Sequence, residues 1–366
     1  MTSGSKCAAV SNVPRSLCPA DRSVPEASAP MPESAQRSIE SNAISDPGIS
    51  TLSGVLDAAS MRAYLQEVIP DEWGTVQNVS FHILKHHPGS RCTFEIGLRT
   101  TNGRYCLIGK VYAADRFDVY RAMNEIRRAG FGSEDEFSIP KPLAYIPGLR
   151  LLLQEKVQGP RAKQFFLAGS ERDRVEASER CAGWLAKFHA TAPQSGDVLD
   201  PTGEMRSIAK WSRTIAELGE PLAVLAGRVS KRLEERAAAV ANGMELCAGH
   251  GSYSCHQVIL SEGRTIAFDW DAYDVADPCH DVARFLVALQ RLAFKYLGSI
   301  RALDTAAEVF LKTYQGLSPF RVAANLPWYR ALTCLRLSKY EANRPVCTFG
   351  KGIEVLLREG LRVLEQ

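Results

Sequence analysis

A polar loop followed by a carboxylate at the end of an apolar strand constrains this chain more than any other feature. The loop runs from His250 to Gln257, and residues 265–268 form an apolar stretch that leads into Asp269. Functional side chains gather on such loops, and Mg²⁺ prefers carboxylate and amide oxygens as ligands. We therefore predict that Asp269 and Gln257 hold a metal ion. The simpler alternative is that Asp269 only caps a turn.

The composition argues against several classes of protein. With 45% hydrophobic and 23% charged residues, the 366-residue chain has the make-up of a globular protein. A net charge of +3 provides no general attraction to nucleic acid or to membranes. No apolar run approaches the roughly 18–20 residues of a membrane helix, and no apolar signal segment follows Met1. We expect a cytoplasmic protein without nucleic-acid or membrane partners, and the sequence leaves its oligomeric state open.

The ten cysteines are spread along the chain, and none forms a C-x-x-C pair. Zinc sites usually draw on closely spaced cysteines and histidines. Free thiols are therefore expected rather than a zinc centre.

The first 50 residues differ from the rest of the chain because they are rich in Ser and Pro and contain no aromatic residue. Such a segment buries too little apolar surface to offset the entropy lost on ordering. We predict a disordered tail over residues 1–50, with partner binding as the alternative.

The remaining pattern predicts two lobes in an α+β fold. Apolar alternation and turn signals give a small β-rich N-lobe over residues 51–157, and helical periodicity dominates a larger C-lobe over residues 158–366. In the N-lobe we expect strands at 79–84, 92–98, 105–112 and 151–157, and helices at 52–69 and 115–130, the second capped by Asp115.

Lys110 stands inside the apolar strand 105–112. A lysine there either reaches water from an edge strand or presents a buried cation to a phosphate. The helix that follows carries Glu125, which could pair with Lys110 and so favours the second interpretation. Asp118 is the other candidate partner.

The turn over residues 86–92 is the expected place for a phosphate-binding loop, although it holds only one glycine, Gly89. Backbone N–H groups of a turn can bind phosphate, and Arg91 could add a positive charge. The alternative is a plain hairpin turn with a solvated arginine.

Taken together, these motifs resemble the aminoglycoside phosphotransferase and choline kinase-like family, a relative of the protein kinases. In protein kinases the catalytic loop has the pattern H-R-D-x-x-x-x-N, with Asp as base and Asn as metal ligand. The aminoglycoside phosphotransferase and choline kinase-like family has the pattern H-G-D-x-x-x-x-N-V-L, followed by I-D-W-E or F-D-x-D and then by G-D-P-x-x-D-L-A. The matching stretches here are 250–259, 268–271 and 276–283, and the resemblance extends over about residues 52–366.

This resemblance implies a bilobal protein-kinase-like fold and a phosphotransferase. The expected reaction moves the γ-phosphate of ATP, or of another nucleoside triphosphate, to a hydroxyl of a small molecule with the help of Mg²⁺. Lys110 and Glu125 match the family's lysine–glutamate pair, and Glu155 to Val157 match the linker that meets the adenine.

Three histidine and aspartate positions have expected supporting roles. His250 matches a histidine that braces the catalytic loop. Asp277 and Asp281 are expected to form a turn and a helix cap that brace the same loop. His189 lies on an otherwise apolar helix and is expected to be a packing residue.

Two positions depart from the family pattern. Gln257 replaces Asn and keeps an amide oxygen, whereas Ser252 replaces the Asp that would serve as base. A serine hydroxyl is no base near neutral pH, so Asp271 could substitute for it, or activity could be weak or absent. The candidate catalytic residues are therefore Ser252, Asp271 and the loop histidine His250.

Because of the missing carboxylate, the alternative function is a catalytically impaired pseudokinase that binds nucleotide or a protein partner. A kinase of a protein hydroxyl is a third possibility. An aminoglycoside acceptor is disfavoured because the C-lobe shows no dense acidic cluster.

Overall fold

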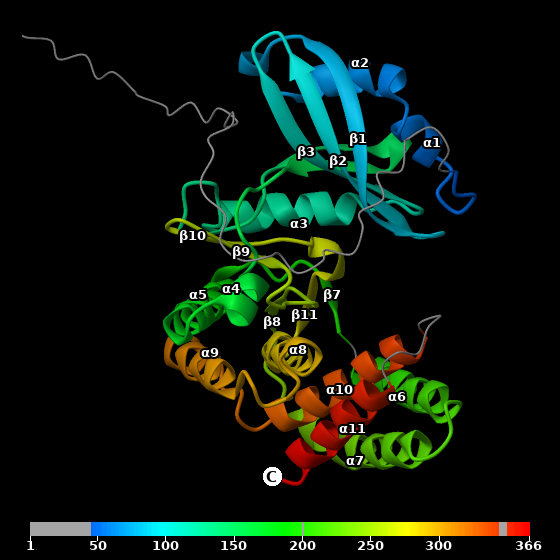
Figure 1. Ribbon diagram of the computed structural model, residues 1–366, viewed down its shortest axis with the longest axis vertical. Coiled ribbons are helices and arrows are strands. Elements are labelled where there is room, and N and C mark those ends of the chain that lie inside the picture. The colour runs from blue at the N-terminus through cyan, green and yellow to red at the C-terminus, as the bar shows by residue number, and fades with distance from the viewer. Residues whose placement is uncertain (1–44, 200, 344–349) are drawn as a thin grey trace, which may run out of the picture. The chain divides into compact units, whose positions relative to one another are not determined.

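A computed structural model describes residues 45–199, 201–343 and 350–366. The N-lobe contains a five-stranded antiparallel sheet in the order β1-β2-β3-β6-β5 (Figure 1). Two small sheets in the order β4-β10-β9 and β7-β11-β8 accompany the helices of the C-lobe. The strands are β1 (Val76–His87), β2 (Arg91–Thr100), β3 (Arg104–Tyr112), β4 (Phe137–Ser138), β5 (Pro142–Ile146), β6 (Leu151–Glu155), β7 (Asp197–Val198), β8 (Cys247–Gly249), β9 (Val258–Ser261), β10 (Arg264–Ala267) and β11 (Asp274–Ala276).

The helices lie mainly in the C-lobe, as the periodicity of the sequence predicts. They are α1 (Leu52–Val55), α2 (Ala58–Val68), α3 (Phe117–Arg128), α4 (Ala162–Ala168), α5 (Glu171–Thr191), α6 (Pro201–Ala216), α7 (Leu222–Asn242), α8 (Cys279–Leu297), α9 (Asp304–Leu317), α10 (Leu326–Ala342) and α11 (Gly350–Leu364), with short 3₁₀ turns η2 (Asp71–Trp73), η3 (Pro147–Leu149) and η4 (Trp270–Ala272). None of the described helices is long and apolar enough to cross a membrane. The α+β class predicted from the sequence is confirmed.

The N-lobe sheet forms because its strands alternate buried and more exposed residues. In β2, Phe94, Ile96 and Leu98 are buried and the residues between them are only partly so. They share an apolar cluster with Met61 and Leu65 of α2. Period-two alternation of this kind directs one face of a sheet toward a core.

The helix of the N-lobe joins the core of the C-lobe. Met123 and Ile126 of α3 are fully buried in the same cluster as Trp184 and Phe188 of α5. Because this apolar core is continuous, the sheet and the helical lobe are packed together rather than merely linked. Tyr112, the last residue of β3, is buried in the same cluster.

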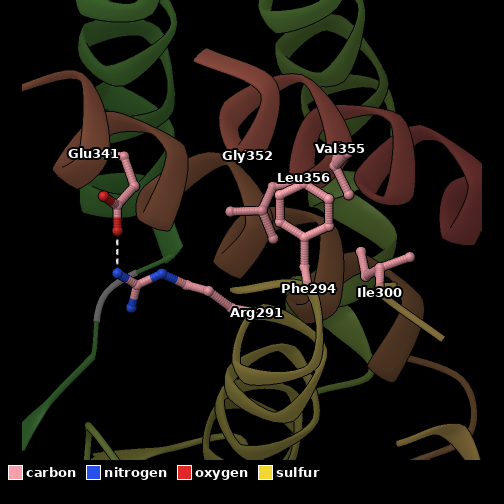
Figure 2. A pocket seen from close by; sticks show the side chains of 7 residues that line it. All are labelled: Arg291, Phe294, Ile300, Glu341, Gly352, Val355 and Leu356. Atoms are coloured by element: carbon pink, nitrogen blue, oxygen red, sulfur yellow. Dashed lines mark hydrogen bonds and ion pairs between the residues drawn. The ribbon is translucent and has the colours of Figure 1, made fainter. Parts of the chain in front are cut away.

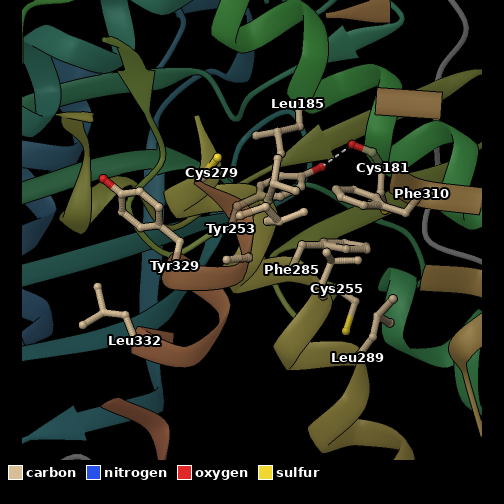
Figure 3. Packing of buried hydrophobic residues seen from close by; sticks show 14 of the residues in the cluster. Cys181, Leu185, Tyr253, Cys255, Cys279, Phe285, Leu289, Phe310, Tyr329 and Leu332 are labelled. Carbon is tan, nitrogen blue, oxygen red and sulfur yellow. Dashed lines mark hydrogen bonds between the residues drawn. The ribbon is translucent and has the colours of Figure 1, made fainter. Parts of the chain in front are cut away.

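The core of the C-lobe also anchors the polar loop (Figure 3). Tyr253 stacks on Trp184 of α5 and on Phe285 of α8, with ring centroids 5.4 and 5.6 Å apart. Its hydroxyl donates a hydrogen bond of 2.8 Å to the carbonyl oxygen of Cys181. The loop is thus held from below by a buried ring whose polar end is satisfied.

Two N-lobe predictions need correction. The expected helix 52–69 is two helices, because Leu56 and Asp57 interrupt it and Asp57 caps the second. Asp115 does not cap α3; it accepts a hydrogen bond from the hydroxyl of Tyr145, and the cap residue is Arg116.

The predicted tail falls mostly outside the described residues, which begin at Ser45. Its last residues, however, have definite contacts. Ile49 is buried in the N-lobe core, and Asp46 accepts hydrogen bonds from Gly89 and His86 of the β1–β2 turn, both at 2.8 Å. The contacts of the N-lobe therefore begin before residue 51.

Candidate active site

Asp281 braces the polar loop, as expected. Its carboxylate accepts hydrogen bonds from the backbone N–H of His250 at 2.6 Å and of Tyr253 at 3.3 Å. His189 lies 3.5 Å from the same carboxylate and hydrogen-bonds the hydroxyl of Tyr314 at 2.7 Å. Burial alone would raise the pKa of Asp281, but the hydrogen bond and charge of His189 hold it below its usual value. The loop is therefore tied to α8 by an ionised carboxylate.

Asp277 has a second bracing role. It accepts a hydrogen bond of 2.8 Å from the backbone N–H of Cys279, the first residue of α8. Asn325 donates to its other oxygen at 2.9 Å. Asp277 thus satisfies the start of α8, the helix that carries Asp281.

Backbone geometry at two positions shapes the site. Gly251 has φ of +72°, and a Cβ there would collide with the carbonyl oxygen of Ala272. Asp269 also has a positive φ, +78°, which is uncommon for a residue other than glycine. Both residues lie where the loop meets the end of β10. Their unusual backbone conformations therefore shape the turn that positions the candidate site residues.

Ser252 forms part of a hydrogen-bonded chain with His250 and Gln257. Its hydroxyl lies 3.3 Å from Nδ1 of His250, and Nε2 of Gln257 donates to it at 3.0 Å. Nε2 of His250 lies 3.2 Å from the carbonyl oxygen of Phe268. A carbonyl oxygen only accepts, so Nε2 carries the hydrogen and Nδ1 of the neutral ring is free to accept from Ser252.

His250 is neutral near pH 7 in this setting. It is completely buried, and burial is the main cause that lowers its pKa, against the opposing charge of Asp281. A neutral imidazole with Nδ1 facing a hydroxyl is a proton acceptor. The loop pattern alone indicates mainly a bracing role for His250, so this capacity is a finding of the structure.

Gln257 turns its amide nitrogen, not its oxygen, toward Asp269. Nε2 lies 3.4 Å from Oδ2 of Asp269, while Oε1 accepts from the Ser254 hydroxyl at 3.0 Å. A metal ligand must present oxygen, so Gln257 fits this role only after its amide rotates by half a turn. Asp269 fits directly, and Mg²⁺ needs only one or two carboxylates beside waters and phosphates.

Lys110 meets the C-lobe at this site. Its Nζ donates to Oδ1 of Asp269 at 2.7 Å and to Oδ1 of Asp271 at 3.1 Å. Burial alone would lower the pKa of Lys110, but the two carboxylates outweigh it and raise the pKa. Lys110 likewise holds the pKa of Asp269 well below its usual range, against the effect of burial. The lysine is a buried cation in the site, not an edge-strand lysine in water.

The predicted pairing of Lys110 with Glu125 is not formed. Glu125 accepts a hydrogen bond of 2.5 Å from Ser195 and lies 4.0 Å from Arg121. The other candidate, Asp118, pairs with Arg116. The reason is the orientation of α3, whose buried stripe faces the core and leaves Glu125 on a partly exposed flank.

Asp271 lies beside Lys110 in the place that was predicted for Glu125. Besides Lys110, its side chain accepts from Tyr112 at 2.8 Å and lies 3.0 Å from Nε of Arg91. It therefore faces N-lobe donors, which argues against its predicted role as a substitute base beside Ser252. Tyr112 was missed from the sequence, although it lies two residues after Lys110 and so on the same strand face.

Arg91, the first residue of β2 after the β1–β2 turn, lies at the site beside Asp271, and its contact with phosphate remains a prediction. His87, at the start of the turn, was not predicted. Its Nε2 is buried without a hydrogen-bond partner among the described residues. Burial, then the charges of Lys85 and Arg91, lower its pKa, and the carboxylates of the site act in the opposite sense. The turn thus presents an imidazole and a guanidinium near the two aspartates.

The linker residues lie between the lobes. Glu155 ends β6 and accepts a hydrogen bond of 3.0 Å from the backbone N–H of Lys141. Val157 follows in the segment that leads to α4. Their predicted contact with adenine remains a prediction, since it depends on backbone groups and a nucleotide.

A pocket elsewhere in the C-lobe is unrelated to this chemistry (Figure 2). It lies between α8, α10 and α11, beside the ion pair of Arg291 and Glu341. Its volume of about 10 Å³ is at most that of one water molecule. None of the predicted site residues lines it.

Comparison with solved structures supports the fold. The choline kinase LicA from Streptococcus pneumoniae is 16% identical, with a TM-score of 0.56 over 83% of this chain and 99% of that one. A thermostable mutant of the aminoglycoside phosphotransferase APH(4)-Ia is 13% identical, with a TM-score of 0.53 over 82% and 98%. A ternary complex of streptomycin, ATP and APH(2″)-IIa is 16% identical, with a TM-score of 0.52 over 84% and 98%. The predicted bilobal, protein-kinase-like architecture is confirmed.

Comparison of the sequence itself gives the family. No curated protein matches the chain. The model of the phosphotransferase enzyme family matches residues 98–327, which is more than half of the chain and includes Lys110, the polar loop and both site aspartates. The chain therefore belongs to the phosphotransferase enzyme family.

Proposed function

We propose that this protein is an ATP-dependent phosphotransferase that moves the γ-phosphate to a hydroxyl group of a small molecule. The observation that carries the proposal is the contact of 2.7 Å between Lys110 of the N-lobe and Asp269 of the C-lobe, next to the braced loop. Phosphoryl transfer needs a cation for the nucleotide phosphates, a carboxylate for the metal and a positioned acceptor. The family of the chain supports the same reaction, as does the structural neighbour that was solved with ATP and streptomycin bound.

The metal and the nucleotide would be bound by the same charged side chains that form ion pairs with one another in this structure. Asp269 would hold Mg²⁺, together with Gln257 once its amide oxygen faces the ion. Bound Mg²⁺ neutralises negative charge on the transferred phosphate. Lys110 would exchange part of its contact with Asp269 and Asp271 for phosphate oxygens, and Arg91 would add a second cation from the turn. Asp271 serves as the counter-charge that keeps both cations in place.

The proton of the acceptor needs a route that does not use a carboxylate at position 252. We infer a relay in which the acceptor O–H gives its proton to Oγ of Ser252 while Ser252 gives its own proton to Nδ1 of His250. The acceptor oxygen forms its bond to the γ-phosphorus as the bond from that phosphorus to the β–γ bridging oxygen breaks. The Phe268 carbonyl orients the imidazole throughout, because it accepts from Nε2.

A specific observation also favours the alternative, an impaired relative that binds nucleotide without turning it over. Ser252 is not a carboxylate, and the oxygen of Gln257 faces Ser254 rather than the metal position. Both features would slow chemistry more than they would weaken nucleotide binding.

Two measurements on the full chain separate these functions. Thermal shift with Mg-ATP tests binding, and ATP turnover over a panel of hydroxylated small molecules tests transfer. Asp269→Ala should abolish the Mg-ATP shift, whereas Asp118→Asn, which changes an exposed carboxylate of α3, should leave it unchanged. Binding without turnover of any acceptor would favour the impaired relative. An Asp269→Ala variant that binds Mg-ATP like the parent would contradict the assignment of the metal site.

A further inference from the structure

The region between α6, α8 and α10 contains two arginines that form no ion pair with any residue that the structure describes. Arg284 is on α8, three residues after the Asp281 that braces the loop, and Arg336 is on α10. Figure 1 shows α10 between α8 and α6. Within the described ranges, neither Arg284 nor Arg336 forms an ion pair with a carboxylate. This is unusual for largely buried arginines, because charged groups that leave water are normally paired.

Some buried polar atoms on these helices, and on the strand β11 that leads into α8, have no hydrogen-bond partner within the described chain. Among the described residues they are Nη1 of Arg284, Nε of Arg336, Oδ1 of Asp274 and Oε2 of Glu204. A buried polar atom without a partner is costly, so such atoms indicate where a ligand or water completes the hydrogen bonds.

The charge of Arg336 acts on Arg284. Burial, and then the charge of Arg336, lower the pKa of Arg284 to about 10. Arg336 lies over the ring of Trp211 on α6, 5.8 Å from its centroid. Burial alone would raise the pKa of Tyr340, but the nearby charge of Arg336 lowers it. Two cations that repel each other beside aromatic rings form a ready site for an anion.

Among the described residues no carboxylate forms an ion pair with either arginine, although the charge of Asp281 partly offsets the effects of burial and of Arg336 on the pKa of Arg284. Asp274 lies 3.5 Å from Nδ1 of His280 and is therefore paired with that histidine. Glu204 lies near Tyr329, whose pKa is raised by burial first and then by surrounding charges that include Glu204. These two acids can still accept hydrogen bonds from the neutral or cationic parts of a ligand.

Two residues of this region, Asp274 and His280, adjoin the polar loop. In the pairing of β11 with β8, Asp274 lies opposite Gly249, the residue before His250. His280 directly precedes Asp281 and feels the charge of Arg336. A ligand held by the arginines is therefore on the α8 side of the loop that carries Ser252.

From this arrangement we propose that Arg284 and Arg336 bind an anionic group, a carboxylate or a phosphate, on the acceptor molecule. The proposal rests on the proposed phosphotransferase function and names the chemical class of its acceptor as a hydroxylated anion. Cationic acceptors such as choline or aminoglycosides would be repelled by the same pair of guanidinium groups.

The test compares small hydroxylated probes that differ in charge. Isothermal titration calorimetry would measure the binding of glycerate, glycerol 3-phosphate, glycerol and choline to the full chain, with and without Mg-ADP. We expect the two anions to bind at least about tenfold more tightly than glycerol and choline, because charge-assisted hydrogen bonds are the strong ones. Preference between glycerate and the glycerol phosphate distinguishes a carboxylate from a phosphate.

Variants locate the binding. Arg284→Gln and Arg336→Gln should each weaken binding of the anions by about tenfold or more. Arg336→Lys, which keeps the charge, should weaken it less and guards against a folding defect. Arg236→Gln, at an exposed position of α7, is the matched control and should change nothing. Mg-ATP binding should be unaffected in all four variants.

Several results would overturn the proposal. These are binding of choline or glycerol as tight as that of the anions, anion binding that the Gln variants leave unchanged, or no anion binding at millimolar concentration. Failure of the proposed function is a different outcome. It would appear as absence of Mg-ATP binding and turnover while glycerate or glycerol 3-phosphate still binds and still depends on the two arginines.

Discussion

Replacing Asp271 by asparagine tests whether this carboxylate of the C-lobe stabilises the protein by neutralising the N-lobe cations Lys110 and Arg91. The side chain is only 8% exposed and contacts Lys110, Tyr112 and Arg91. Asn keeps the shape and an acceptor oxygen but removes the negative charge. Lys110 keeps Asp269 as a partner in the variant. The stability lost at Lys110 is therefore only the difference in free energy between a charge-assisted and a neutral hydrogen bond, about 1 kcal/mol.

The other contacts add less. Arg91 is 31% exposed, and although its Nε is 3.0 Å from Oδ2 of Asp271, that oxygen has no well-directed hydrogen bond. Solvent screening limits this pair to about 0.5 kcal/mol. A buried lysine whose charge is only partly neutralised carries a further cost beyond the losses at Lys110 and Arg91. We therefore expect a total loss of roughly 1.5–2.5 kcal/mol in the free energy of unfolding.

Urea denaturation of the parent and the variant measures this loss, and one transition is expected because α3 and α5 share a core. Asp118→Asn is the control, since this exposed carboxylate should contribute about 0.5 kcal/mol or less. Mg-ATP binding should be retained in Asp271→Asn, because Asp269 remains. The assigned role of Asp271 is refuted if Asp271→Asn costs no more than Asp118→Asn, or if it abolishes Mg-ATP binding as loss of a metal ligand would.

Three other changes probe the loop, its brace and the N-terminal contacts. Ser252→Ala should lower turnover at least about tenfold without changing Mg-ATP binding, and Ser252→Asp should raise turnover by up to about 10²–10⁴ because it supplies a base directly; an Ala variant as active as the parent would exclude the relay. Asp281, whose pKa is depressed in the folded state, stabilises the fold fully above its unfolded pKa of about 3.9 and loses this contribution as the pH falls through the folded pKa. Asp281→Asn should therefore destabilise the protein at pH 7 and flatten its stability below about pH 4, as unfolding at graded pH would reveal. Deleting residues 1–44 should leave the melting temperature nearly unchanged, whereas deleting 1–50 should cost about 2 kcal/mol or more, because Ile49 is fully buried; equal melting temperatures would contradict the Ile49 contact.

The fold and the frame of the site could be read from the sequence because both depend on local patterns. Alternation of apolar residues specifies β2 and β3, and the spacing of His250, Gln257 and Asp269 follows from a loop between two short strands. Apart from the bracing role of Asp281, which the resemblance to kinase loops implied, these relations are local. Such relations involve residues close in the chain or in adjacent strands.

The pairings of the site depend on tertiary packing. Lys110 was expected to meet Glu125, but the rotation of α3 about its axis is set by the burial of Met123 and Ile126 in the common core. That rotation directs Glu125 to Ser195 and leaves the position beside Lys110 to Asp271. No local pattern in the sequence determines the rotation of a helix against a distant core.

The chemistry available to Ser252 was likewise beyond the sequence. Which nitrogen of His250 can accept a proton depends on the Phe268 carbonyl, eighteen residues away, and the direction of the Gln257 amide depends on Ser254 and Asp269. Patterns along the chain were enough to identify a bilobal member of a phosphotransferase family with one expected carboxylate missing. Which charges face one another became clear only in the folded molecule, because hydrogen bonds and ion pairs act over a few ångströms between side chains that the chain order does not place.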